Sequence, residues 1–155
     1  MSHTLDFETV VQDAEALKRA LLRMEVPESL IEIHDSPVRL NTYHKEENKI
    51  AHVVVRRKLN EHYSSDIGWE RNDEGLFVGH IDEYHYCGEP TPPWYDAAWQ
   101  KKLYTYYNVE ATKIAFERQG MEYTESQDKQ GRIQLRAKFK AAPVKANKIK
   151  IHTTR

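Results

Sequence analysis

The densest group of side chains capable of chemistry lies between positions 80 and 87. It contains His80, Asp82, His85 and Cys87. Imidazole, carboxylate and thiolate groups all bind zinc and other transition metals. On an extended strand the first two side chains point to one face and the last two to the other, so a shared metal would require a bend. The spacing matches no recognised zinc motif, and a half-exposed strand with its polar side chains outward is the simpler interpretation.

Nucleophilic catalysis is the second chemistry that this cluster suggests. Cys87 is the only thiol in the chain, and His85 lies two residues away. Closeness in sequence says little here, because a nucleophile and its base must meet in space. The chain has neither the Gly-x-Ser-x-Gly of many hydrolases nor a Gly-x-x-x-x-Gly-Lys phosphate loop. A metal- or cysteine-dependent enzyme of hydrolase type, centred on the four clustered residues, is therefore our alternative hypothesis.

Asp66 is a candidate for acid–base work because it precedes Ile67-Gly68-Trp69, and a carboxylate buried beside an indole ring can hold a proton. An aspartate before a strand and a glycine more often shapes a turn, and we favour that structural interpretation. Gly68 indicates a bulge or a close approach of another part of the chain.

Aromatic and arginine side chains form a different kind of candidate site. Six of the 16 aromatic residues lie between Trp94 and Tyr107, more than one helix face can bury. Rings with a polar edge stack on nucleobases or anchor protein interfaces, and guanidinium groups hold phosphates and carboxylates. Core packing explains about half of these rings. The residues that we expect to bind a ligand are Arg56, Arg71, Trp69, Trp94, Tyr95, Tyr104 and Tyr106.

Two segments show the three-and-four spacing of amphipathic helices. The first follows Thr9-Val-Val-Gln12, which is typical of a capping box, and ends at Pro27. The second is expected from about Trp94 to Gln119 and ends at Gly120. The positions expected to be buried are Ala14, Leu17, Leu21 and Met24 in the first helix and Trp99, Leu103, Tyr107, Ala111 and Ile114 in the second.

Strands are expected to outnumber helices. Their ranges are 2–7, 30–34, 38–43, 49–58, 66–71, 76–84, 121–125 and 132–139. Polar hairpin loops are expected at 72–75 and 127–131, and a stiff proline-rich connector at 88–93. This order predicts an α+β fold, in which an antiparallel sheet of about six to eight strands packs against one short N-terminal and one long C-terminal helix. Residues 1–139 would form a single domain, and residues 140–155 a basic tail that is flexible or adds one edge strand.

Length and composition fit one ordinary soluble domain, with 155 residues of which 39% are hydrophobic and 30% charged. A single cysteine fits a reducing cytoplasm. No apolar run approaches the roughly 20 residues of a membrane span, and the N-terminus lacks the pattern of a secretory signal. We therefore expect a cytoplasmic protein with no membrane partner.

Charge is distributed unevenly along the chain. Residues 137–155 carry six basic side chains and no acidic one, whereas the preceding 136 residues have a net charge of −7. The whole chain is close to neutral, so nucleic acid is not an expected partner. The basic residues of the tail are spread out, which favours a solvated tail.

Three groups of residues resemble a known family. They are Met1-Ser2-His3 with Asp13, Leu17 and Ala20-Leu21; Asp66-Ile67-Gly68-Trp69 with Arg71-Asn72, Gly75 and Asp82; and the run 111–120 with Gly131-Arg132-Ile133-Gln134-Leu135. Together, over residues 1–139, they are similar to the plastid and cyanobacterial hypothetical-reading-frame family called domain of unknown function 1257. The proline segment 87–94 and the longer basic tail depart from that family. The resemblance implies a fold and no activity, and an association of the family with large ATPases implies an accessory role.

These observations favour a non-catalytic binding or accessory protein. Its aromatic and arginine side chains would hold a protein partner or sequester a small anionic ligand of nucleotide type. No cofactor is expected, and the formation of a homo-oligomer is left open.

Overall fold

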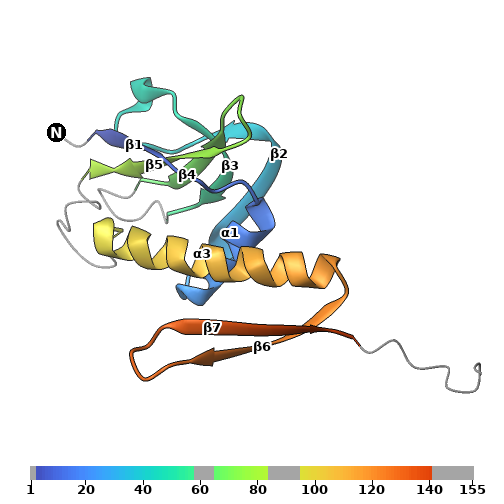
Figure 1. The fold of residues 1–155 in the computed structure, drawn as a ribbon. Helices are drawn as coiled ribbons and strands as arrows, with labels where there is room; N and C mark the ends of the chain where they lie inside the picture. The colour runs from blue at the N-terminus through green and yellow to red at the C-terminus, as the bar shows by residue number, and fades with distance from the viewer. Residues whose placement is uncertain (1–2, 58–64, 84–94, 141–155) are drawn as a thin grey trace, which may run out of the picture. The chain divides into compact units, whose positions relative to one another are not determined.

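A computed structural model describes residues 3–57, 65–83 and 95–140 of the chain (Figure 1). The chain divides into two compact units, Met1–Ala111 and Thr112–Arg155. The boundary falls inside the long helix α3, Ala97–Arg118. Among the described residues, no helix is long and apolar enough to cross a membrane. The expected connector at 88–93 and all of the expected tail except Lys140 lie outside the described residues.

The first unit is built on a five-stranded antiparallel sheet. Its strands are β1 (Thr4–Glu8), β2 (Ile31–Arg39), β3 (Ile50–Val55), β4 (Ile67–Arg71) and β5 (Phe77–Asp82). They lie in the order β1-β5-β4-β3-β2, as Figure 1 shows. The α+β class and the antiparallel pairing are thus confirmed. The expected single sheet of six to eight strands is wrong, because the last two of the described strands form a sheet of their own.

Strand β2 replaces two strands that the sequence predicted. Its pairing with β3 shifts register between Ile33 and Val38, which is the mark of a β-bulge. Asp35-Ser36-Pro37, which separate the predicted strands 30–34 and 38–43, therefore form an irregularity inside one strand. Pro37 lacks an N–H group, and proline is tolerated at bulges and on edge strands, which is where β2 lies.

Helix α1, Ala14–Arg23, begins later than the capping box predicted. Its N-cap is Asp13, whose Oδ1 accepts hydrogen bonds from the backbone N–H groups of Glu15 and Ala16 at 2.9 and 3.2 Å. The Thr9 hydroxyl instead donates to the Phe77 carbonyl. The predicted capping box is thus wrong, because a distant strand takes its hydroxyl group.

The end of α1 also differs from the prediction, because the helix stops at Arg23, before Pro27. Glu25 then has a left-handed backbone with φ of 64°, which turns the chain away from the helix axis.

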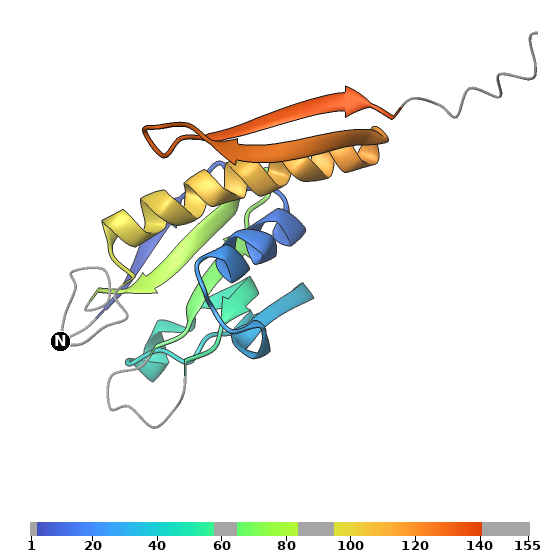
Figure 2. The same cartoon turned by 90° about the horizontal axis from the view of Figure 1, so that it is seen from below.

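One face of the five-stranded sheet is apolar and covered by helix. The register places Phe7, Gly79, Trp69, Val53 and Ile33 in one row across all five strands. The Tyr104 hydroxyl of α3 accepts a hydrogen bond from Trp69 Nε1 at 3.3 Å, which places the first turns of α3 on this face. Figure 2 shows α1 beside the middle turns of α3. The Tyr107 hydroxyl links the two helices by accepting from the backbone N–H groups that precede α1.

The predicted helical stripe of α3 is largely confirmed. Asp96 caps the helix by accepting from the Trp99 N–H at 2.9 Å, so α3 begins three residues later than predicted. It ends before Gly120, whose φ of 69° suits glycine, as predicted. The fully buried positions of the stripe are Leu103, Tyr107 and Ile114, whereas Trp99 and Ala111 are half-buried.

The second unit combines the last turns of α3 with a hairpin of β6 (Met121–Gln127) and β7 (Ile133–Phe139). Seven residue pairs join the two strands, from Met121 opposite Phe139 to Gln127 opposite Ile133. Asp128 closes the predicted loop by accepting from the N–H groups of Gln130 and Arg132. Within this unit, Lys113 Nζ of α3 lies 3.0 Å from Glu125 Oε1 of β6.

Candidate functional site

His80 lies on the sheet face opposite the apolar row, between two carboxylates. Its Nδ1 is 2.7 Å from Asp6 Oδ1, and its Nε2 is 2.9 Å from Glu70 Oε2. The side chain is only 4% exposed. Asp6 pairs directly with His80 across β1 and β5, so the register itself brings them together. Both ring nitrogens therefore have partners inside the protein.

The other metal candidates do not join His80 in the described structure. Asp82 shares its sheet face, as predicted, but accepts a hydrogen bond from the Ser65 hydroxyl at 3.0 Å. His85 and Cys87 lie outside the described residues. Within residues 3–57, 65–83 and 95–140, no three His, Cys, Asp or Glu side chains are grouped so that they could hold a metal ion.

Asp6 extends the His80 contacts to a lysine. Lys49 Nζ lies 2.6 Å from Asp6 Oδ2, which gives a chain of polar contacts from Lys49 through Asp6 and His80 to Glu70. Burial acts to raise the pKa of Asp6, but the hydrogen bonds from Lys49 and His80 outweigh burial and hold that pKa below its ordinary value. These contacts join β1 to β5 and to the residue that precedes β3, and they join β5 to β4.

Replacing Asp6 by asparagine should therefore change the pH dependence of stability. A carboxylate with a depressed pKa stabilises the fold above its unfolded pKa, and this contribution is lost as the pH falls through the folded pKa. We expect Asp6→Asn to be less stable than the wild-type protein at pH 7, with a difference that shrinks as the pH falls below about 4. Urea unfolding at a series of pH values measures this, with the exposed Asp73→Asn as control. A difference that is independent of pH would contradict the assignment.

Asp66 is a structural acceptor, in agreement with the favoured interpretation. The residue is 2% exposed. Its oxygens accept from the Asn41 N–H at 2.8 Å and from the Arg57 N–H at 3.0 Å. Arg56 Nη1 donates to Asp66 Oδ2 at 2.6 Å.

Arg56, predicted to bind a ligand, is engaged within the protein. Its Nε donates to Glu32 Oε1 at 3.0 Å, while its Nη1 donates to Asp66. The hydrogen bond from Arg56 is the main reason why the pKa of Glu32 lies below its ordinary value. The guanidinium therefore joins β2 to the residue before β4.

Trp69 and Tyr104, also predicted to bind a ligand, belong to the packed interior. Trp69 is 2% exposed. Burial raises the pKa of Tyr104, although its hydrogen bond with Trp69 acts in the other direction. The cavity beside the two rings measures about 10 Å³, which is room for one water molecule. A nucleobase cannot stack on these rings without displacing the core.

Three of the remaining residues predicted to bind a ligand, Tyr95, Tyr106 and Arg71, each take part in a cation–π contact, but these contacts do not form one surface. The Arg57 guanidinium lies 4.7 Å from the centre of the buried Tyr95 ring. The Arg23 guanidinium lies 4.5 Å from the Tyr106 ring. Arg71 is exposed, with its guanidinium 4.8 Å from the Phe77 ring. Trp94 lies outside the described residues.

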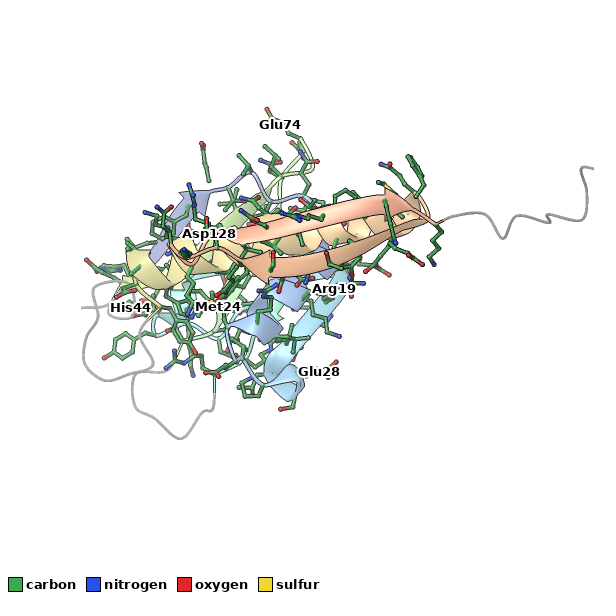
Figure 3. The ribbon with its side chains drawn as sticks, turned by 60° about the horizontal axis from the view of Figure 1, so that its bottom comes forward. Arg19, Met24, Glu28, His44, Glu74 and Asp128 are labelled. Carbon is green, nitrogen blue, oxygen red and sulfur yellow. The ribbon has the colours of Figure 1, made fainter. Side chains whose placement is uncertain are left out.

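A second site, which sequence reasoning missed, lies on the β6–β7 hairpin. A groove of about 700 Å³ opens there. We call it the hairpin groove, and its lining residues are Glu117, Met121, Glu122, Tyr123, Thr124, Arg136, Ala137, Lys138 and Lys140. Figure 3 shows side chains along the whole hairpin, with Asp128 labelled at its loop.

The cations of the hairpin groove are largely uncompensated. Lys138 faces Glu122 across the strands, with Nζ 3.9 Å from Oε2. Arg136 and Lys140 are exposed, and neither has an ion-pair partner among the residues that the structure describes. The strand pattern that could have revealed this site is the two-residue spacing of Arg136, Lys138 and Lys140, which places all three on one face.

The wall of the hairpin groove nearest α3 is held in place by Tyr123. Its hydroxyl donates to Glu117 Oε1 at 2.8 Å, and its ring lies 6.2 Å from the Phe116 ring. The Lys113 ammonium lies 6.0 Å from the same ring. A two-stranded hairpin is marginal by itself, so these contacts with the last turns of α3 give the groove a fixed wall.

Comparisons of the chain with protein-family models, with curated proteins and with solved structures find no match. The resemblance to domain of unknown function 1257 therefore stays a prediction.

Proposed function

We propose that this protein is a non-catalytic binding protein that holds an anionic protein partner in the hairpin groove. The observation that carries the proposal is the groove of about 700 Å³ lined by three cations, Arg136, Lys138 and Lys140. Two of them, Arg136 and Lys140, have no ion-pair partner among the described residues. Uncompensated cations in a groove attract carboxylates or phosphates and raise the rate of encounter with an anionic partner.

The composition of the hairpin groove favours binding over catalysis. Its nine lining residues include no histidine, cysteine or serine. The Glu117 carboxylate accepts the Tyr123 hydroxyl, and Glu122 faces Lys138. Catalysis requires a nucleophile or a general base within reach of a substrate, and each carboxylate of the groove already has a partner.

The enzyme, the nucleotide-type ligand and the accessory role remain hypotheses. The enzyme alternative centred on His80, Asp82, His85 and Cys87 gains no support from His80, whose two nitrogens contact Asp6 and Glu70. A small nucleotide-type ligand is less well supported than a protein, because the hairpin groove is open and extends along two strands. An accessory role in a larger assembly is compatible with a protein partner.

The proposal predicts that charge reversal in the hairpin groove weakens the binding of a polyanion. We expect a fluorescein-labelled decaglutamate to bind the wild-type protein and to bind the double variant Arg136→Glu/Lys140→Glu about tenfold or more weakly at low salt. Fluorescence anisotropy measures both affinities.

The matched control is Lys101→Glu/Lys129→Glu, which changes the net charge by the same amount at two exposed positions outside the groove. Equal losses in the two double variants would show that only net charge matters, and the groove would then be rejected as the site. Circular dichroism spectra establish that both variants are folded.

A further inference from the structure

We infer that the partner held by the cations of the hairpin groove is an extended peptide, with alternating acidic and apolar residues, that adds as a strand to the free edge of β7. This inference rests on the proposed function and specifies the chemistry of the partner. It combines three properties of β7, which are its unpaired backbone edge, its row of cations and its partly uncovered apolar face.

The edge of β7 is open in the described structure. The second sheet has two strands, so each has one neighbour and one free edge. Among the described residues, the backbone of β7 bonds only to β6, and its other side has no backbone partner. Such an edge is a template for another strand, and the main-chain hydrogen bonds of strand addition supply affinity without regard to sequence.

Side chains on β7 determine which peptide fits. Arg136 and Lys138 point to one face, and Lys140 follows at the same spacing. Leu135 and Ala137 point to the other face together with Phe139, which is 70% exposed. Side chains directly across two paired strands interact, so a complementary strand would alternate carboxylates with apolar groups.

The distribution of charge along the chain favours β7 over β6 as the strand that an acidic peptide would join. From Arg136 to the end, the sequence has seven basic residues and no acidic one, whereas β6 contains Glu122 and Glu125. An acidic peptide would meet like charges along the edge of β6 and opposite charges along the edge of β7. Like charges directly opposite each other destabilise a strand pair.

The same row of cations argues against a second copy of this chain. Two β7 strands paired edge to edge would bring Arg136 and Lys138 of one copy against the same cations of the other. The surroundings of the cations also argue for a protein rather than nucleic acid, because proteins bind single-stranded nucleic acid by stacking its bases on aromatic rings beside cations. The cation face of the hairpin, formed by Glu122, Thr124, Ser126, Gln134, Arg136 and Lys138, carries no ring.

The experiment compares labelled peptides of identical composition by fluorescence anisotropy. One alternates glutamate and valine, and the other has the same residues in two blocks. We expect the alternating peptide to bind at least about tenfold more tightly, because only it matches both faces of β7 at once. Two further peptides have every second backbone nitrogen methylated, in either phase. Since alternate residues of a strand turn their N–H groups to opposite edges, one of them should lose binding and the other keep it.

Different results separate the two proposals. If the alternating and block peptides bind equally and both are weakened by Arg136→Glu/Lys140→Glu, the groove binds anions but strand addition is wrong. If no acidic peptide binds, both proposals are wrong. Tighter binding of a single-stranded oligonucleotide of equal charge, or self-association that the same variant abolishes, would overturn the acidic peptide as the occupant. Retention of binding by both methylated peptides would also overturn strand addition.

Discussion

Replacing Asp66 by alanine is expected to lower the free energy of unfolding by about 2 kcal/mol or more, because the change leaves partly buried donors without this acceptor. The carboxylate accepts from two backbone N–H groups, those of Asn41 and Arg57, and from the guanidinium of Arg56. Its side chain is almost completely buried, so water cannot replace it. Urea denaturation followed by circular dichroism gives the change in free energy.

Two further variants test the cause of that loss. Asp35→Ala makes the same chemical change at an exposed position and should alter stability by less than about 0.5 kcal/mol. Asp66→Asn keeps one carbonyl acceptor and should lie between the wild-type protein and the alanine variant. A loss below about 1 kcal/mol in Asp66→Ala would mean that the donors find other partners, and the structural role would then be rejected.

The second large effect is expected for Gly68→Ala, a change of one methyl group. A Cβ atom at this position would lie 2.6 Å from Ala51 Cβ and 2.7 Å from Leu40 Cδ1, closer than atoms can pack. The sheet would have to shift, and such overpacking costs about 1–3 kcal/mol or more. We expect a lower denaturation midpoint in urea, with the slope of the transition unchanged.

Gly79 supplies the control, because it lies in the neighbouring strand and its added methyl would lie at ordinary distances of 3.4 Å or more. Gly79→Ala should therefore cost much less than Gly68→Ala. Removing the Ala51 methyl in a Gly68→Ala/Ala51→Gly variant should recover part of the loss, since the two sites are in contact. If the changes in unfolding free energy of the two single variants simply added in the double variant, the predicted clash between the new Cβ and the Ala51 methyl would be contradicted.

The fold was predictable where local patterns and tertiary contacts agree. The two predicted hairpin loops contain Gly75 and Gly131, both of which have a left-handed backbone. Thr9 shows where local reasoning fails, because its hydroxyl bonds to Phe77, 68 residues away, and Asp13 takes its place as the helix cap. No local rule foresees a partner at that distance.

The two sheets could not be separated from sequence for a similar reason. Alternation identifies a strand, but it does not say which strand lies beside it. Residues 121–139 alternate as well as other segments, yet within the part of the chain that the structure describes β7 pairs only with β6.

The residues predicted from the sequence to bind a ligand do not line the hairpin groove. Arginine and aromatic side chains do pair, as Arg57 does with Tyr95, but several of these pairs lie inside the first unit. Glu110 illustrates the difficulty. Its spacing from Tyr107 puts it on the buried stripe of α3, and only the structure reveals Arg23 Nη1 at 3.2 Å as its partner. The cations of β7 were visible in the sequence, but their significance depends on the open edge beside them.

The two outer strands of the five-stranded sheet are poor templates for further pairing. On β2 the register shift and Pro37 interrupt the row of outward N–H groups. On β1 the Thr4 N–H donates to Glu47 Oε1 at 3.1 Å, so a side chain occupies a position that an incoming strand would need. These interruptions disfavour the edge-to-edge association of copies of the first unit at high protein concentration.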